Sequence, residues 1–151
     1  MVVTKGGKRE IRTQFAALCY RVLKGETQIL LVTSRSSKRW IVPKGWPANG
    51  LTPAQSAAKE AWEEAGVKGK TFENCVGLYS YEKFLTEESS LPCVVALFPI
   101  LVSDLKNNFP EKTERTRRWF TPQKAAKKVA EPELQAILAN FTAPPKPKAG
   151  R

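Results

Sequence analysis

Residues 45–67 read GWPANGLTPAQSAAKEAWEEAGV, and this stretch predicts the helix around which the rest of the fold is arranged. Thr52 suits the N-cap, Pro53 suits the first helical position, and Gln55 completes a T-x-x-Q capping box. The residues that follow are dense in helix formers. Gly66 is the kind of residue at which helices stop. The sequence therefore predicts a helix that begins after Thr52 and ends at Gly66.

Three glutamates share one face of this predicted helix. Because an α-helix advances about 100° per residue, Glu63 and Glu64 fall within roughly 60° of Glu60. Alanines and Trp62 occupy the opposite face. Like charges this close repel one another, and a hard divalent cation with oxygen ligands relieves the repulsion. The alternative is an ordinary solvated acidic face that Lys59 partly neutralises, and the glutamates alone leave both readings open.

A loop rich in glycine and proline leads directly into the helix. It spans residues 43–51 and carries Lys44. Backbone amides at a helix N-terminus and a nearby lysine are suited to binding phosphate. The combination of this loop with a carboxylate face favours metal-dependent chemistry on a phosphate compound.

Outward from the helix, extended segments alternate with further helices. Strands are predicted before the helix at 15–23, 28–34 and 39–42, and after it around 81, at 93–102 and at 117–120. Further helices are predicted to start at Thr121-Pro122 and at Glu131-Pro132. Strands on both sides of a central helix, with another helix near the end, predict an α/β fold packed in layers.

The remaining segments are predicted to lack regular structure. We expect irregular backbone after residue 67, a polar connection at 82–92 and a polar loop at 106–116. Residues 1–12 are interpreted as a basic N-terminal arm and residues 143–151 as a disordered tail rich in proline and lysine. Residues 13–142 are left as the single domain.

The composition narrows the possible functions. The chain has 151 residues with 25 Lys and Arg against 14 Asp and Glu, a formal net charge of +11 that favours polyanionic partners. It has no histidine, which excludes Ser-His-Asp and Cys-His triads and histidine metal ligands. The cysteines Cys19, Cys75 and Cys93 are too widely spaced for a zinc site, and Cys19 and Cys93 are predicted to be buried.

No segment of the sequence has the length or polarity of a membrane anchor. Its apolar runs are far shorter than the roughly 20 residues that a membrane span needs. The N-terminus has no long apolar stretch of the kind found in secretory signals. We therefore expect a cytoplasmic protein without a membrane partner.

The spacing from Gly45 through Glu60, Glu63 and Glu64 to Gly66 resembles the Nudix box, G-x5-E-x7-R-E-U-x-E-E-x-G-U, in which U is aliphatic. The order of the wider chain, from the early hairpin to the Trp-Phe pair before the last helices, also resembles that family. The resemblance implies a Nudix-type α/β/α sandwich with a mixed central sheet. It further implies a metal-dependent hydrolase that cleaves a diphosphate bond.

Two positions depart from the box. Leu51 stands where the family has a glutamate that supports the metal site. Lys59 stands where the family has an arginine that orients a catalytic carboxylate, and lysine lacks the planar two-pronged geometry of arginine.

The resemblance also implies roles for the remaining positions. Glu60, Glu63 and Glu64 are expected to act in catalysis and to bind Mg²⁺ or Mn²⁺, with the Gly45 carbonyl as a further ligand and Glu60 as the first choice for general base. Relatives often recruit another acid from outside the box, and the candidates here are Glu111 and Glu114.

Other motifs resemble the branch that hydrolyses diphosphoinositol polyphosphates and diadenosine polyphosphates. These motifs are RWIVPKG at residues 39–45 and the pair Trp119-Phe120. The segment from FPEK at residues 109–112 to RRWF at residues 117–120 particularly resembles bacterial members of that branch. Trp40 and Trp119 within them are interpreted as structural anchors more readily than as platforms for a base. We predict phosphate contacts from five cations, although each is also compatible with an ordinary surface role: Arg39, Lys44, Lys83, Arg117 and Arg118.

Two alternatives stay open at this point. The departures at Leu51 and Lys59 suit a Nudix-like module that binds a polyphosphate without cutting it. The basic arm and tail suit an enzyme that removes pyrophosphate from RNA 5′ ends, although no aromatic-rich RNA platform is evident, so nucleic acid ranks below a small-molecule polyphosphate as partner. The sequence makes no prediction about oligomeric state.

Overall fold

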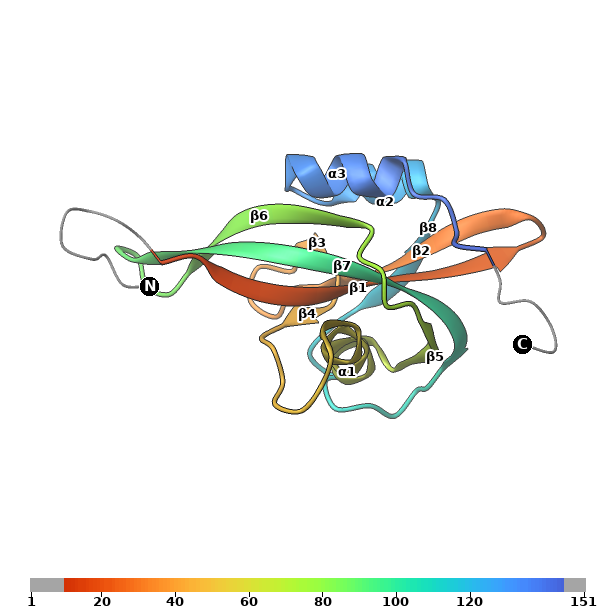
Figure 1. The fold of residues 1–151 in the computed structure, drawn as a ribbon, viewed down its shortest axis with the longest axis horizontal. Coiled ribbons are helices and arrows are strands. Elements are labelled where there is room, and N and C mark those ends of the chain that lie inside the picture. The colour runs from red at the N-terminus through yellow and green to blue at the C-terminus, as the bar shows by residue number, and fades with distance from the viewer. Residues whose placement is uncertain (1–9, 146–151) are drawn as a thin grey trace.

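The computed structural model describes residues 10–145 and consists of one mixed sheet between helices (Figure 1). The strands are β1 Arg12–Leu23, β2 Glu26–Thr33, β3 Trp40–Ile41, β4 Lys44–Gly45, β5 Val67–Thr71, β6 Gly77–Phe84, β7 Ser90–Leu105 and β8 Arg117–Phe120. The helices are α1 Pro53–Ala65, α2 Pro122–Lys128 and α3 Pro132–Ala139. Residues 1–9 of the predicted basic arm and residues 146–151 of the predicted tail lie outside the described residues.

The centre of the sheet is a pair of long parallel strands. β1 runs parallel to β7, with Arg12 opposite Cys93 and Tyr20 opposite Leu101. Every other strand pairing is antiparallel, including β2 on β1 and β6 and β5 on successive parts of β7. The principal strand order is β3-β2-β1-β7-β5. The sheet is therefore mixed, as predicted.

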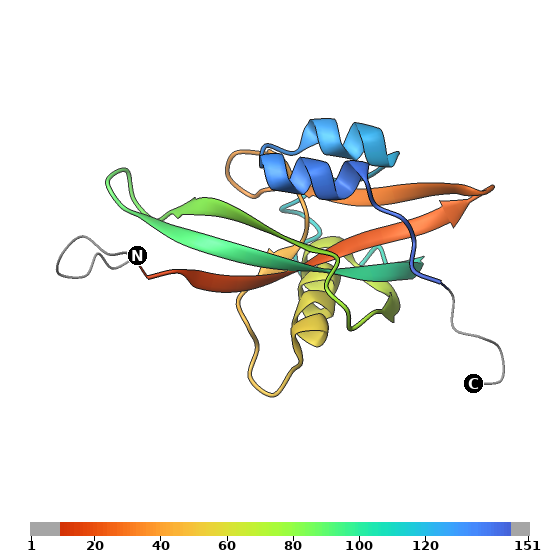
Figure 2. The same cartoon turned by 45° about the horizontal axis from the view of Figure 1, so that its top comes forward.

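Helices cover both faces of this sheet. In Figures 1 and 2, α2 and α3 lie together on one side, whereas α1 crosses the other. Two apolar cores follow from this arrangement. One joins Leu18, Leu31 and Leu97 to the α2–α3 layer, and the other joins Ala17 and Leu30 to the alanine face of α1. Alternate residues of each strand feed opposite cores because strand side chains alternate between faces. The predicted α/β layering is confirmed.

The central helix forms as the sequence predicts. The Thr52 hydroxyl accepts a hydrogen bond from the Gln55 amide at 3.1 Å, and the Gln55 side chain accepts one from the Thr52 amide at 2.9 Å. Gly66 ends the helix in the left-handed region, with φ of 69°. Its amide donates to the carbonyls of Ala61 and Trp62, which satisfies groups that a helix end leaves unpaired.

Several boundaries differ from the predictions. β4 lies inside the predicted loop, and β5 lies where irregular backbone was predicted. β6 and β7 extend into the predicted polar connection, to Phe84 and from Ser90. β1 starts at Arg12, which was predicted to be the last residue of the basic arm. The domain bounds 13–142 remain a prediction.

Other predictions about the core are confirmed. Cys19 and Cys93 are buried, and Trp40 and Trp119 each pack against one of the two cores. Among the described helices, none combines the length and the apolar character needed to cross a membrane.

Candidate active site

The structure contains a polar cavity of about 380 Å³. Its walls come from β1, β4, β6, α1 and the 106–116 loop. Carboxylates and cations both reach it, and the residues that carry the chemistry are Lys44, Gly45, Glu60, Glu64, Lys83, Glu111 and Arg115. The cavity thus joins residues from the predicted box with residues far from it in sequence.

Glu60 is held against the backbone of β4. β4 pairs with β1 through Phe15 and Gly45, and this pairing brings the loop strand alongside α1. A Cβ atom added to Gly45 would overlap the Glu60 carboxyl group, so only glycine leaves room for it there. Burial raises the Glu60 pKa, the hydrogen bond with Glu64 opposes that rise, and the neighbouring Glu63 charge adds to it.

Glu64 is the most deeply buried carboxylate of the cavity, with 4% of the residue exposed. Its Oε1 atom is buried and accepts no hydrogen bond within the described residues. Burial raises the Glu64 pKa to about 8, although the Arg115 and Lys44 charges oppose the rise. A buried carboxylate oxygen without a donor is costly, so this atom is suited to a cation supplied from outside the chain.

The Glu60 and Glu64 side chains are electrostatic neighbours that line the same cavity. A divalent cation between two adjacent carboxylates offsets the cost of burying their negative charge.

The Glu63 side chain lies outside the cavity, unlike those of Glu60 and Glu64. Its carboxylate pairs with Lys59 Nζ at 2.7 Å, and it does not line the cavity. Among residues 10–145, no three acidic or cysteine side chains converge in the arrangement of a preformed metal cage. The structure thus brings Glu60, Glu64 and Gly45 together and leaves the Glu63 side chain outside.

Glu111 and Arg115 reach the cavity from outside the box. The Glu111 amide donates to the Glu63 carbonyl at 3.0 Å, which ties the 106–116 loop to α1. Arg115 donates to Glu111 Oε1 at 2.7 Å and to the Thr33 carbonyl at 3.0 Å, and its Nη2 lies 3.8 Å from Glu64 Oε1. Of the two acids predicted outside the box, Glu111 lines the cavity.

The other predicted acid, Glu114, pairs with Arg35 at 3.4 Å and does not line the cavity. Sequence reasoning did not assign Arg115 to the site. The available signal was its spacing of four residues from Glu111, which allows an ion pair in a turn.

Two of the five predicted phosphate-binding cations, Lys44 and Lys83, line the cavity. Lys44 lies 5.1 Å from the centre of the Tyr81 ring, and the Tyr81 hydroxyl donates to Gln14 at 2.5 Å. Burial lowers the Lys44 pKa to about 8, although the Glu64 and Glu131 charges oppose the shift, so the ammonium group is still mostly charged at neutral pH.

The other three predicted cations lie elsewhere. Arg39 pairs with Glu131 at 3.2 Å, outside the residues that line the cavity. Arg117 turns toward the end of α1 and donates to the carbonyls of Ala65 at 2.6 Å and Lys106 at 2.8 Å. Arg118 lies in a different pocket, on the α2 side of the sheet. The structure therefore does not bring these three arginines to the carboxylates.

Comparisons with known protein sequences agree on one family. A family model described as the NUDIX domain matches residues 12–141. Nudix hydrolase 16, mitochondrial, of Arabidopsis thaliana is 31% identical over 114 residues, which are 74% of this chain and 63% of that protein. Diphosphoinositol polyphosphate phosphohydrolase 3-alpha of Mus musculus is 30% identical over 114 residues, with 74% and 65% covered. The chain spans about three fifths of the length of the curated relatives it matches.

Solved structures show the same fold. A C. elegans Ap4A hydrolase in a binary complex superposes with a TM-score of 0.62 at 20% identity, over 85% of this chain and 93% of that chain. A MutT protein from Methanosarcina mazei Go1 gives a TM-score of 0.62 at 19% identity, over 87% and 93%. The Nudix-type sandwich expected from the sequence is thereby confirmed.

Proposed function

The chain belongs to the NUDIX family, and on that premise we propose that it uses Mg²⁺ or Mn²⁺ to hydrolyse a diphosphate bond in a nucleoside or inositol polyphosphate. The observation that carries this proposal is that the buried Glu64 and the partly buried Glu60 share one cavity with the cations Lys44 and Lys83. Carboxylates attract a hard divalent ion and the lysines attract phosphate, so the cavity suits the two together.

The residues present fit a divalent ion. Glu64 offers a buried oxygen without a hydrogen-bond donor, Glu60 lies beside it, and the Gly45 backbone lies against the Glu60 carboxyl group. We propose Glu60, Glu64 and the Gly45 carbonyl as ligands, with Glu63 held in reserve because its side chain is paired with Lys59. When bound, the ion supplies Lewis-acid activation of a phosphoryl group and of a water molecule.

The chain's own groups have separate tasks in this proposal. Lys44 and Lys83 bind and orient phosphoryl oxygens, and their charge opposes the repulsion between the carboxylates and an anionic substrate. Arg115 positions Glu111 and Glu64 through its two ion pairs. Glu60 is the candidate base because it borders the cavity and burial raises its pKa above the ordinary value.

The substrate class is proposed from the relatives and from the charge of the cavity. One relative is named a diphosphoinositol polyphosphate phosphohydrolase, and one structural neighbour is named an Ap4A hydrolase. Both names describe compounds with several phosphoryl groups, which suits the basic side of the cavity. The cytoplasmic location stays a prediction, and the Arabidopsis relatives have the word mitochondrial in their names.

The test is hydrolysis of a substrate panel with Mg²⁺ or Mn²⁺, with the products identified by mass. The panel holds a diadenosine polyphosphate, a diphosphoinositol polyphosphate and an RNA with a 5′-triphosphate. We expect Glu64→Gln to lower kcat by at least about 100-fold because one negative ligand is lost. Glu73→Gln, which changes an exposed glutamate away from the cavity, is the matched control and should turn over normally.

A second candidate function is binding of a polyphosphate without cleavage. Its specific support is the pairing of Glu63 with Lys59, which removes that carboxylate from the cavity, together with the exposed Leu51 at a family glutamate position. The same panel separates the two functions. Tight binding of a panel compound with no product under either metal would favour the binding module and contradict the hydrolase.

A further inference from the structure

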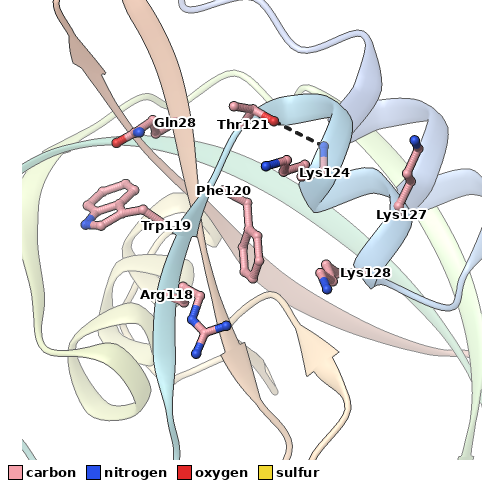
Figure 3. A pocket seen from close by; sticks show the side chains of 8 residues that line it. All are labelled: Gln28, Arg118, Trp119, Phe120, Thr121, Lys124, Lys127 and Lys128. Atoms are coloured by element: carbon pink, nitrogen blue, oxygen red, sulfur yellow. Dashed lines mark hydrogen bonds between the residues drawn. The ribbon is translucent and has the colours of Figure 1, made fainter.

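A second cavity of about 670 Å³ lies between β8 and α2 (Figure 3). Its lining includes the cations Arg118, Lys124, Lys127 and Lys128 together with the rings of Trp119 and Phe120. None of its lining residues borders the carboxylate cavity. The two cavities are therefore separate sites.

In the part of the chain that the structure describes, no acidic residue lines this second cavity. Within residues 10–145, none of its four cations forms an ion pair with a carboxylate. Several other cations of the described chain, including Arg35, Arg39 and Arg115, do form such pairs. The cavity thus concentrates positive charge that has no carboxylate partner among the described residues.

The placement of the lysines increases their mutual repulsion. Lys124, Lys127 and Lys128 are spaced three and four residues apart, so they share one face of α2. Arg118 adds a fourth charge from the neighbouring strand. Like charges at this spacing destabilise a short helix, and an anion bound among them would relieve that cost.

Two of the cations are oriented by aromatic rings. Arg118 lies over the Trp40 ring at 5.6 Å from its centre, and Lys128 lies 5.8 Å from the centre of the Phe120 ring. A cation–π contact fixes the direction of a side chain but leaves its positive charge and its hydrogen-bond donors available. Contacts of this kind restrict a side chain, and a restricted side chain loses less entropy when it binds a ligand.

We infer that this cavity, lined by Arg118, Lys124, Lys127 and Lys128, binds a compact polyphosphate anion at a site distinct from the carboxylate cavity. The cavity has a size usual for small-molecule sites, whereas a nucleic-acid strand needs a track of charge with exposed stacking rings. Phe120 is almost completely buried, and Trp119 is partly buried with Arg21 over its ring at 4.2 Å from the centre, so neither ring is an open stacking platform. This inference does not depend on the proposed hydrolase activity.

The test is calorimetric titration of the full chain with inorganic tripolyphosphate in buffer with EDTA, which removes metal from the carboxylate cavity. We expect Lys124→Gln/Lys128→Gln to weaken tripolyphosphate binding at least tenfold. Binding to the parent chain should also weaken as salt rises, because exposed charges are screened. Arg118→Gln, on the strand instead of the helix, should weaken binding as well and tests the site without changing α2.

Two control variants distinguish binding in this cavity from nonspecific attraction to the positive charge of the protein. Lys68→Gln/Lys70→Gln removes the same charge from exposed positions on β5 and should leave binding unchanged. Lys83→Gln changes the carboxylate cavity and should also leave this binding event unchanged. Equal weakening by the β5 variant, or loss of binding only in Lys83→Gln, would overturn the inference.

A third arm replaces tripolyphosphate with a single-stranded RNA of about ten nucleotides. Weaker binding of the RNA than of tripolyphosphate supports a compact ligand. Much tighter binding of the RNA through the same lysines would overturn the compact-ligand assignment. Thermal melting of each variant establishes that a change in affinity does not come from loss of the fold.

Discussion

Among single residues, Glu64 has the sharpest conflict between its charge and its surroundings. It is buried, one of its oxygens has no donor, and its pKa of about 8 shows that the metal-free fold favours the protonated form. The same conflict that suits this group to a cation must lower the stability of the chain when the cation is absent.

This conflict predicts a pH dependence of stability in EDTA. The folded-state pKa of about 8 lies above the ordinary value of 4.5, so folded protein holds a proton that unfolded protein releases between those pH values. The free energy of unfolding should therefore fall as pH rises through this window, by up to about 1.4 kcal/mol per pH unit. Glu64→Gln cannot titrate, so denaturant unfolding should show it gaining stability relative to the parent as pH rises.

Glu73→Gln is the control for this experiment because it removes an exposed carboxylate. It should keep the slope of the parent chain across the window. An identical pH dependence in the parent and in Glu64→Gln would contradict the raised Glu64 pKa.

Gly45 yields a second prediction for a single residue. Because a Cβ at this position would overlap the Glu60 carboxyl group, Gly45→Ala should displace Glu60 and lower kcat by about 100-fold. Shortening the acid relieves the overlap, so Gly45→Ala should cost less when it is combined with Glu60→Asp. A double-mutant cycle on kcat measures this coupling, and strict additivity would show that the two residues act independently.

The carboxylates of the site were predictable from sequence because helical spacing is local. Glu60 and Glu64 follow from a period of 3.6 residues, and this geometry holds wherever the helix is placed. Arg115 could not be assigned in this way because its position depends on how the 106–116 loop folds back onto α1. For Glu63 the helical spacing was right, but its carboxylate pairs with Lys59 and does not line the cavity.

Among the elements, α1 depends on a distinct device at each end. A capping box starts the helix, and its carboxyl end is closed by the left-handed Gly66 and by the guanidinium group of Arg117. Each device supplies partners for backbone groups that have none within the helix. The orientation of the carboxylates therefore depends on residues well outside the acidic face.

Replacement of Arg117 is predicted to lower stability with little effect on substrate affinity. Its hydrogen bonds to the Ala65 and Lys106 carbonyls are part of the fold, so Arg117→Ala should lower the free energy of unfolding by about 1–3 kcal/mol. The KM for a polyphosphate substrate should stay within about twofold, since the residue does not line the carboxylate cavity. A large rise in KM with unchanged denaturant stability would instead place Arg117 in the substrate site.

The elements were predictable to the extent that their signals were local. α1, α2 and their caps follow from short motifs, and β8 was predicted at its observed bounds. β4 has two residues in a loop rich in proline, and it forms only because β1 supplies its partner. β5 reads VKGKT, with little apolar character, and it is likewise a strand because β7 lies beside it.

For the whole molecule, the burial of each cysteine predicts how fast its thiol reacts. Cys19 and Cys93 are buried and burial raises both pKa values, whereas Cys75 is exposed. An aromatic disulfide reagent should therefore modify one thiol rapidly in the native state, and the other two only on unfolding. Cys75→Ser should remove the fast phase, and two rapidly reacting thiols in the parent chain would contradict the described packing.

The parallel ladder between β1 and β7 constrains how the molecule assembles. Arg12 must find Cys93, and Tyr20 must find Leu101, so the central contacts join the start of the domain to a segment made much later. Contacts of such high sequence separation slow folding, because the entropy of a long loop is lost before the stabilising contacts form. On the ribosome, the first hairpin and α1 emerge well before β7, so the central ladder cannot close until most of the domain has been synthesised.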